Sequence, residues 1–165
     1  ISACEKGGQW QRALGLFSRM ERSQVAPDRV SYNVVLEALF DQPTGIKLFG
    51  EALNARAYFS RELPERHCID LHELSAGASL IAALWWLSAV ALRQDVNSAD
   101  VQKLQIITGR GKGRKTWDTT DIKAAIQELM QQLGLPLHRQ SNPGRVEVHT
   151  RRAQLCTSLG LRLHH

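Results

Sequence analysis

The sequence predicts an α+β protein in two parts, an N-terminal α-solenoid fragment followed by a two-layer α/β sheet domain. Residues 1–60 contain two helical hairpins that are similar to each other. Residues 68–150 alternate short apolar runs with helical patterns in the order β-α-β-α-β-β. Between these parts, residues 61–67 form a charged, proline-containing linker, and residues 151–165 form a basic tail.

The N-terminal hairpins share a repeated pattern. A Leu-Phe pair recurs at residues 16–17 and 48–49, in what we predict to be the second helix of each unit. Residues 7–8 and 43–45 contain glycine or proline and are expected to form the turns between helices. The Pro-Asp pair at residues 27–28 is expected to end one unit and start the next. We predict about one and a half truncated solenoid repeats in a fragment of a longer protein.

Two strands and an apolar helix are predicted at the start of the second part. Residues 68–74 (CIDLHEL) and 103–108 (KLQIIT) are short apolar runs suited to strands. Residues 75–94 lie between them and are apolar almost all round, which raises the alternative of a membrane span. The serines and the glycine in this stretch favour a helix buried against a sheet, and no membrane association is expected.

A second helix and two further strands are predicted toward the C-terminus. The stretch DTTDIKAAIQELMQQLG is an amphipathic helical pattern, with Asp118 or Thr119 as its N-cap and Gly134 at its end. Residues 135–140 and 145–150 are predicted strands on either side of an Asn-Pro-Gly turn.

The basic residues are concentrated in the C-terminal part of the chain. The net charge is +5, and residues 101–165 hold 11 Lys or Arg against 4 Asp or Glu. Such an excess attracts polyanions, nucleic acids among them. Cys4, Cys68 and Cys156 lie far apart without a C-x-x-C pair, which argues against a disulfide framework and a cysteine zinc site. We predict no metal site and no small-molecule cofactor, and leave a requirement for divalent metal open.

The stretch LQIITGRGKGRK carries a predicted strand into a glycine-rich basic loop. Gly109, Gly111 and Gly113 alternate with cations, so backbone N–H groups can approach a phosphate that the cations attract. The spacing fits neither a P-loop nor a dinucleotide fingerprint. A solvated basic turn is the alternative. The candidate nucleic-acid contacts in and after this loop are Arg110, Lys112, Arg114, Lys115 and the stacking residue Trp117.

The N-terminal stretch GGQWQRALGLFSRMERSQVAPDRVSYNVVLEAL resembles a pentatricopeptide repeat, with an A-L-x-L-F-x-x-M second helix and a V-x-Y-N start. The resemblance implies a reader of single-stranded RNA in which two polar positions per repeat choose the base. Asn33 matches the first of these positions, and Asp28 matches the closing position of the preceding unit. Neither pair is complete in this fragment. Helix capping is the alternative role for both residues.

The stretches IDLHEL and ITGRGKGR together resemble the L-D-x-H and T-G-x-G signatures of the small MutS-related (Smr) domain, over residues 68–150. The resemblance implies nucleic-acid binding and endonuclease activity. Asp70 and His72 match the first signature, and Thr108, Gly109 and Gly111 match the second. On this basis His72 is the expected general acid or base, Asp70 orients it or positions water, and Arg110 with the loop N–H groups stabilises charge on the phosphate.

Two residues depart from the Smr pattern. Glu73 stands where the family has glycine, and Gly113-Arg114 replaces the His or Ser that usually follows the basic loop residue. These departures weaken the expectation of catalysis more than that of binding.

The combined resemblance implies an RNA-processing factor of the chloroplast or mitochondrion, in which the repeats bind single-stranded RNA and the Smr-like domain binds or cleaves its backbone. DNA is the alternative substrate. A nucleic-acid-binding module without catalysis is the alternative function. A helical scaffold for protein interactions is the second alternative, and it leaves the basic excess unexplained.

Overall fold

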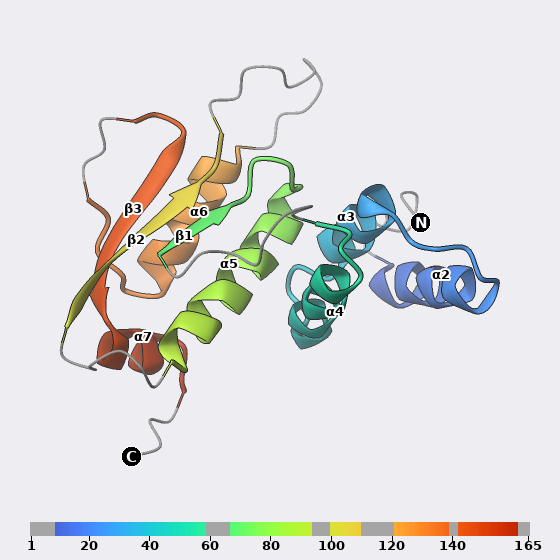
Figure 1. The fold of residues 1–165 in the computed structure, drawn as a ribbon, viewed down its shortest axis with the longest axis horizontal. Helices are drawn as coiled ribbons and strands as arrows, with labels where there is room; N and C mark the ends of the chain where they lie inside the picture. Colours follow the sequence, from blue (N-terminus) through green and yellow to red (C-terminus); the bar gives the residue numbers. More distant parts are fainter. Residues whose placement is uncertain (1–8, 59–66, 94–99, 110–120, 139–141, 162–165) are drawn as a thin grey trace. The chain divides into compact units, whose positions relative to one another are not determined.

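The computed structural model describes residues 9–58, 67–93, 100–109, 121–138 and 142–161 (Figure 1). In these ranges the chain forms six helices and a three-stranded mixed sheet, which confirms the predicted α+β class. The chain divides into two compact units, and neither is continuous in sequence. Unit 1 comprises Ile1–Leu63 and Leu74–Ala82, and unit 2 comprises Pro64–Glu73 and Ala83–His165.

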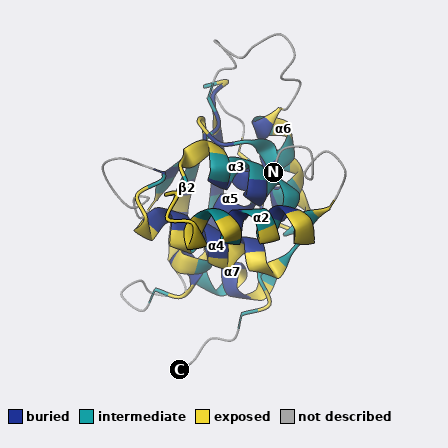
Figure 2. Ribbon diagram, turned by 90° about the vertical axis from the view of Figure 1, so that its right-hand side faces the viewer, coloured by how far each residue is buried: buried dark blue, intermediate teal, exposed yellow. Residues whose placement is uncertain are grey.

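Among its described residues, unit 1 contains three complete helices joined by short turns. They are α2 (Trp10–Arg22), α3 (Arg29–Ala38) and α4 (Pro43–Asn54). On α2 and α4, buried residues alternate with exposed ones, as expected for amphipathic helices (Figure 2). Phe17 of α2 meets Tyr32 of α3 edge-on, with ring centroids 5.0 Å apart. Such aromatic pairs bury a large apolar area and join the two helices into a hairpin.

The predicted turn at residues 43–45 is wrong, because these residues form the first turn of α4. Pro43 begins the helix, where its fixed φ suits the helical conformation and its missing N–H breaks no hydrogen bond. Gly45 is buried, and a Cβ at this position would lie 2.8 Å from the carbonyl oxygen of Leu39. The turn itself lies earlier, where the backbone N–H of Gln42 donates to the carbonyl oxygen of Leu39 over 2.9 Å.

Helix α5 (Ala76–Ala91) contributes its residues up to Ala82 to unit 1 and the rest to unit 2. Its first turn contacts α3 closely. The backbone N–H of Gly77 donates to Glu37 Oε2 over 2.7 Å. A Cβ on Gly77 would lie 2.9 Å from the Cβ of Phe40 and 3.0 Å from the Cα of Glu37. The approach of the two helices therefore requires glycine at this position.

Helix α5 lies within residues 75–94, the stretch for which a membrane span was the alternative to a buried helix. Its buried residues include Ala78, Ile81, Ala82, Ala83, Trp86, Leu87, Val90 and Ala91. Among the helices that the structure describes, none combines the length and the apolarity of a membrane span.

The sheet of unit 2 consists of β1 (Cys68–Asp70), β2 (Val101–Ile107) and β3 (Arg145–Arg151), in that order. β1 is parallel to β2, and β3 is antiparallel to β2. One face is apolar and buried, with Ile69, Leu104, Ile106, Val146 and Val148. Helix α6 (Ile122–Gln132) packs against β3 and lies behind the sheet in Figure 1, and α7 (Arg152–Ser158) also packs against β3.

Three predictions for unit 2 need correction. The strand at residues 135–140 reduces to one bridge between Leu137 and Val148, because Pro136 has no N–H to donate to a ladder. The basic tail contains α7, whose Leu155 and Cys156 are buried. The N-cap of α6 is Asp121, whose Oδ1 accepts from two backbone N–H groups of the first turn, and not Asp118 or Thr119.

The second face of the sheet, here called the polar face, carries the alternate residues of each strand. These are Cys68, Asp70, Val101, Lys103, Gln105, Ile107, Arg145, Glu147, His149 and Arg151. An ion-pair cluster lies at its centre. Lys103 Nζ lies 3.0 Å from Glu147 Oε2, and His149 Nε2 lies 2.9 Å from Glu147 Oε1.

The Glu147 cluster is expected to make stability depend on pH in the acid range. The hydrogen bond from Lys103 and then that from His149 hold the pKa of Glu147 below its ordinary value of 4.5. A folded-state pKa below the unfolded value stabilises the native state above pH 4.5, and this contribution is lost as pH falls through the folded-state pKa. Urea unfolding from about pH 6 down to about pH 2 measures the loss. The Glu147→Gln variant should lack this part of the pH dependence, and an unchanged profile would contradict the assignment.

Candidate functional site

The carboxyl ends of β1 and β2 lie at the same edge of the sheet, because the two strands are parallel. Asp70 is the last residue of β1, and His72 follows in a turn. Thr108 and Gly109 follow the last residue of β2. The structure therefore brings together four of the residues that the sequence analysis nominated, two from each signature.

Asp70 and His72 form a hydrogen-bonded dyad. His72 Nδ1 lies 2.6 Å from Asp70 Oδ1, and the backbone N–H of His72 donates to the same oxygen over 3.1 Å. With Asp70 ionised, this contact assigns the hydrogen of the neutral imidazole to Nδ1 and leaves Nε2 as the proton acceptor. The side chain of His72 is 53% exposed, so a solvent-borne polymer can reach it.

Glu73 adds a second carboxylate to the dyad. Its Oε1 lies 3.9 Å from His72 Nε2, and its side chain is 55% exposed. The distance is too long for a hydrogen bond, but it places a negative charge beside the nitrogen that would accept a proton. This charge disfavours an approaching phosphate.

Gly109 forms the wall of the site opposite the dyad. Its backbone φ of +77° is one that residues with a side chain rarely adopt, and a Cβ there would lie 3.1 Å from the Cβ of His72. The backbone N–H groups of Thr108 and Gly109 both donate to the carbonyl oxygen of Gly144, over 2.9 and 3.2 Å. The glycine turn is thus held in place by backbone contacts and lies against His72.

Thr108 is buried, with 2% of its surface exposed. Its Oγ1 has no hydrogen-bond partner among the described residues. A buried hydroxyl without a partner is uncommon in folded proteins. The orphaned hydroxyl lies next to the glycine turn, at the end of β2.

The turn at residues 142–144 supports the site, a role that the sequence analysis did not assign to it. Asn142 Oδ1 accepts from the backbone N–H of Gly144 over 2.9 Å. Lys123 Nζ, from the first turn of α6, donates to the carbonyl oxygen of Pro143 over 2.9 Å. The Asn-Pro-Gly sequence indicates a turn. Its pairing with Gly109 depends on the register of β3 against β2, which local sequence does not specify.

The basic part of the glycine loop lies outside the described residues. It holds the nominated residues Arg110, Gly111, Lys112, Arg114, Lys115 and Trp117. Their roles in phosphate contact and base stacking remain predictions.

The two nominated residues of the repeats lie in unit 1. Asp28 is the N-cap of α3, and hydrogen bonds from the backbone and side chain of Ser31 hold its pKa below the ordinary value. Asn33 Oδ1 accepts from the hydroxyl of Tyr58 over 2.8 Å. Tyr58 is buried, and burial raises its pKa. Asp28 thus caps a helix, which was the alternative to a role in base selection. Asn33 makes a tertiary contact, which neither base selection nor helix capping predicted.

The described residues contain no group of three or more His, Cys, Asp or Glu side chains placed to hold a metal ion. The site as described therefore consists of the dyad, Glu73, the glycine turn and the supporting turn at residues 142–144.

Known families, curated proteins and solved structures were compared with this chain, and none of them matches it. The resemblances to pentatricopeptide repeats and to Smr domains therefore rest on the quoted motifs alone.

Proposed function

We propose that this protein is an RNA-processing factor that binds single-stranded RNA and cleaves its phosphodiester backbone at the Asp70–His72 dyad. The observation that carries the proposal is the 2.6 Å contact between Asp70 and His72, placed against the glycine turn at Gly109. A histidine oriented by a carboxylate is a recurrent proton-transfer device in hydrolytic and transfer enzymes. The combined resemblance to pentatricopeptide repeats and Smr domains makes a chloroplast or mitochondrion the proposed compartment.

The dyad suits transfer of a proton from a ribose hydroxyl. His72 Nε2 accepts the proton of the 2′-hydroxyl, the O2′–P bond forms, and the P–O5′ bond breaks as the leaving oxygen takes up a proton from water. Asp70 holds the ring by Nδ1 and stabilises the imidazolium that forms. A 2′-deoxy nucleotide at the cleaved position lacks this nucleophile, so this route distinguishes RNA from DNA.

The glycine turn suits the phosphate. Gly109 has no side chain to block an approach to the dyad, and Arg110 follows it directly in the sequence. A guanidinium next to the reacting phosphate would bind its oxygens and stabilise the charge that builds up in the transition state. The cations of residues 110–115 would add affinity that does not depend on base sequence.

The alternative is a nucleic-acid-binding module without catalysis. The Glu73 carboxylate, 3.9 Å from His72 Nε2, favours it, because an anion next to the general base repels the phosphate that the base must serve. A domain of this kind would still hold RNA through the basic loop.

A binding and cleavage assay on one labelled single-stranded RNA, with Mg²⁺ and with a chelator, separates these functions. We expect the parent to bind and cut. The Arg110→Ala/Lys112→Ala variant should bind more weakly, with a salt dependence reduced by about 1.4 in log–log slope for two lost contacts to a single strand. The Arg19→Ala/Lys47→Ala variant removes two exposed cations of unit 1 and serves as the charge-matched control. Binding without cutting would support the non-catalytic module, and absence of binding would contradict both functions.

A further inference from the structure

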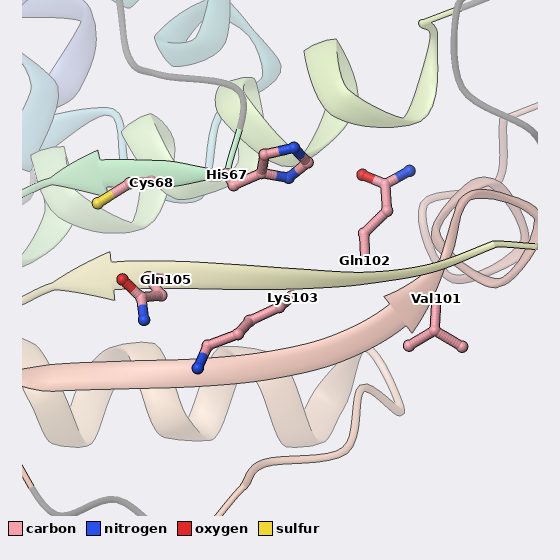
Figure 3. A pocket seen from close by; sticks show the side chains of 6 residues that line it. All are labelled: His67, Cys68, Val101, Gln102, Lys103 and Gln105. Carbon is pink, nitrogen blue, oxygen red and sulfur yellow. The ribbon is translucent and has the colours of Figure 1, made fainter.

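The sheet has a notch where β2 extends past the beginning of β1. β1 pairs with β2 only from Gln105 to Ile107, whereas β2 begins at Val101. A pocket of about 480 Å³ lies at this notch. Its lining residues are His67, Cys68, Val101, Gln102, Lys103 and Gln105 (Figure 3).

Gln102 is a buried polar residue with an unmet hydrogen-bonding requirement. Only 6% of its surface is exposed, and its Nε2 has no hydrogen-bond partner among the described residues. A buried amide without a partner loses its hydrogen bonds to water and gains nothing in exchange. Figure 3 shows the side chains of Gln102 and His67 extending toward the same space. The amide nitrogen is itself buried, and a rotation of the Gln102 side chain would bring it to a group that enters the pocket.

The backbone of β2 adds polar groups at the same place. The N–H of Gln105 donates to the carbonyl oxygen of His67 over 2.7 Å, so this side of β2 points toward β1. Val101 and Lys103 present their backbone groups on the same side, because backbone direction repeats every second residue. Among the described residues, no strand pairs with them there. Together with the amide of Gln102, which lies on the other face of β2 from Lys103 and Gln105, they form an edge of donors and acceptors.

This lining suits a flat, polar heterocycle. The volume of the pocket lies within the range of pockets that hold small organic groups. Donors and acceptors at the edge of the sheet match the hydrogen-bonding edge of a nucleobase, and the aliphatic side chain of Val101 and the imidazole of His67 offer contact surface. A phosphate offers acceptors alone, whereas a nucleobase offers donors to the backbone carbonyl oxygens as well as acceptors to the Gln102 amide.

The pocket and the dyad lie at the two ends of the same strand. Cys68 lines the pocket, and His72 lies four residues farther along the chain, or about 13 Å in extended conformation. A strand of RNA bound at the dyad by one phosphate can therefore follow β1 and place a neighbouring base in the pocket.

We propose that the pocket binds a nucleobase of the single-stranded RNA held at the dyad, and that the Gln102 amide donates a hydrogen bond to an acceptor on that base. This inference rests on the proposed function and adds a base-binding subsite to it. The subsite gives unit 2 a contact with sequence information, in addition to its contacts with the phosphate backbone.

The test measures RNA affinity and stability of the same variant. Gln102→Leu removes the donor and places an apolar side chain in a position that lacks a partner, so the free energy of unfolding should stay the same or rise. Affinity for a short single-stranded RNA, followed by fluorescence anisotropy, should fall about tenfold. In a second series, one abasic nucleotide replaces each nucleotide of the RNA in turn. At one position the abasic nucleotide should lower the affinity of the parent by a similar factor. At that position it should not lower the affinity of Gln102→Leu any further.

Gln131→Leu is the matched control, because the same change is made at an exposed position on α6. If Gln102→Leu does not fold, Gln102→Met provides the same loss of the amide with an unbranched side chain. Equal RNA affinity of the parent and the folded Gln102 variant would overturn the subsite and leave the proposed function standing. Failure of the parent to bind RNA would overturn the proposed function and the subsite with it.

Discussion

Replacement of His72 by alanine is expected to lower the rate of RNA cleavage by about 10²–10⁴-fold, with RNA affinity unchanged. In the proposed mechanism His72 Nε2 is the proton acceptor, whereas the basic loop would supply the binding energy. Single-turnover cleavage with enzyme in excess measures the chemical step apart from binding. Added imidazole should restore part of the rate, because it can enter the space left by the ring and accept the proton.

A matched control and a second variant sharpen this result. His138→Ala removes an exposed histidine of the same unit and should cut at the parental rate. Asp70→Asn keeps the shape of the side chain but no longer holds the hydrogen on Nδ1, so cleavage should slow and its pH profile should change. If His72→Ala cuts as fast as the parent, the dyad is not the catalytic site, and Glu73 is the residue to examine next.

Replacement of Gly77 by alanine is expected to lower the free energy of unfolding by about 2–3 kcal/mol. The added Cβ would lie 2.9 Å from Glu37 Oε2 and from the Cβ of Phe40, and 3.0 Å from the Cα of Glu37. The Cα of Glu37 and the Cβ of Phe40 cannot give way without a shift of the backbone. Urea unfolding followed by far-UV circular dichroism measures the loss.

Replacement of Gly15 by alanine is expected to have the opposite effect on the free energy of unfolding. Gly15 lies in α2, and a Cβ there would meet no heavy atom within 4 Å. Gly15→Ala should therefore raise stability by about 0.5–1 kcal/mol, because alanine restricts the unfolded chain and favours the helix. If both variants lose stability equally, helix packing at Gly77 is not the cause.

Local sequence determined much of the secondary structure. Apolar spacing predicted α2 and α6, a continuous apolar stretch of high helix propensity predicted α5, and short apolar runs predicted the three strands that form the sheet. Gly134, with a φ of +65°, follows α6 as its sequence indicated. The errors lie where local signals were ambiguous. Pro43 is compatible with a turn or with the first turn of a helix, and several acidic or hydroxyl residues preceded α6 as potential caps.

The candidate site shows a similar division. The sequence nominated Asp70, His72, Thr108 and Gly109 through the resemblance of IDLHEL and ITGRGKGR to the Smr signatures. It did not identify the contact of Gly144 with Gly109, because that contact depends on the pairing of β3 with β2.

By itself, the sequence determined most of the segments that form helices and strands, apart from the start of α4, residues 135–140 and α7. It also determined which residue types stand at the strand ends, since both follow from periodicity and side-chain chemistry. Only the tertiary structure decided which distant groups meet. It placed the Glu37 carboxylate at the first turn of α5, the hydroxyl of Tyr58 on Asn33, and the amide of Gln102 in a pocket without a partner among the described residues. Such contacts are set by strand register and by the packing of residues far apart in the chain, and neither has a local signal in the sequence.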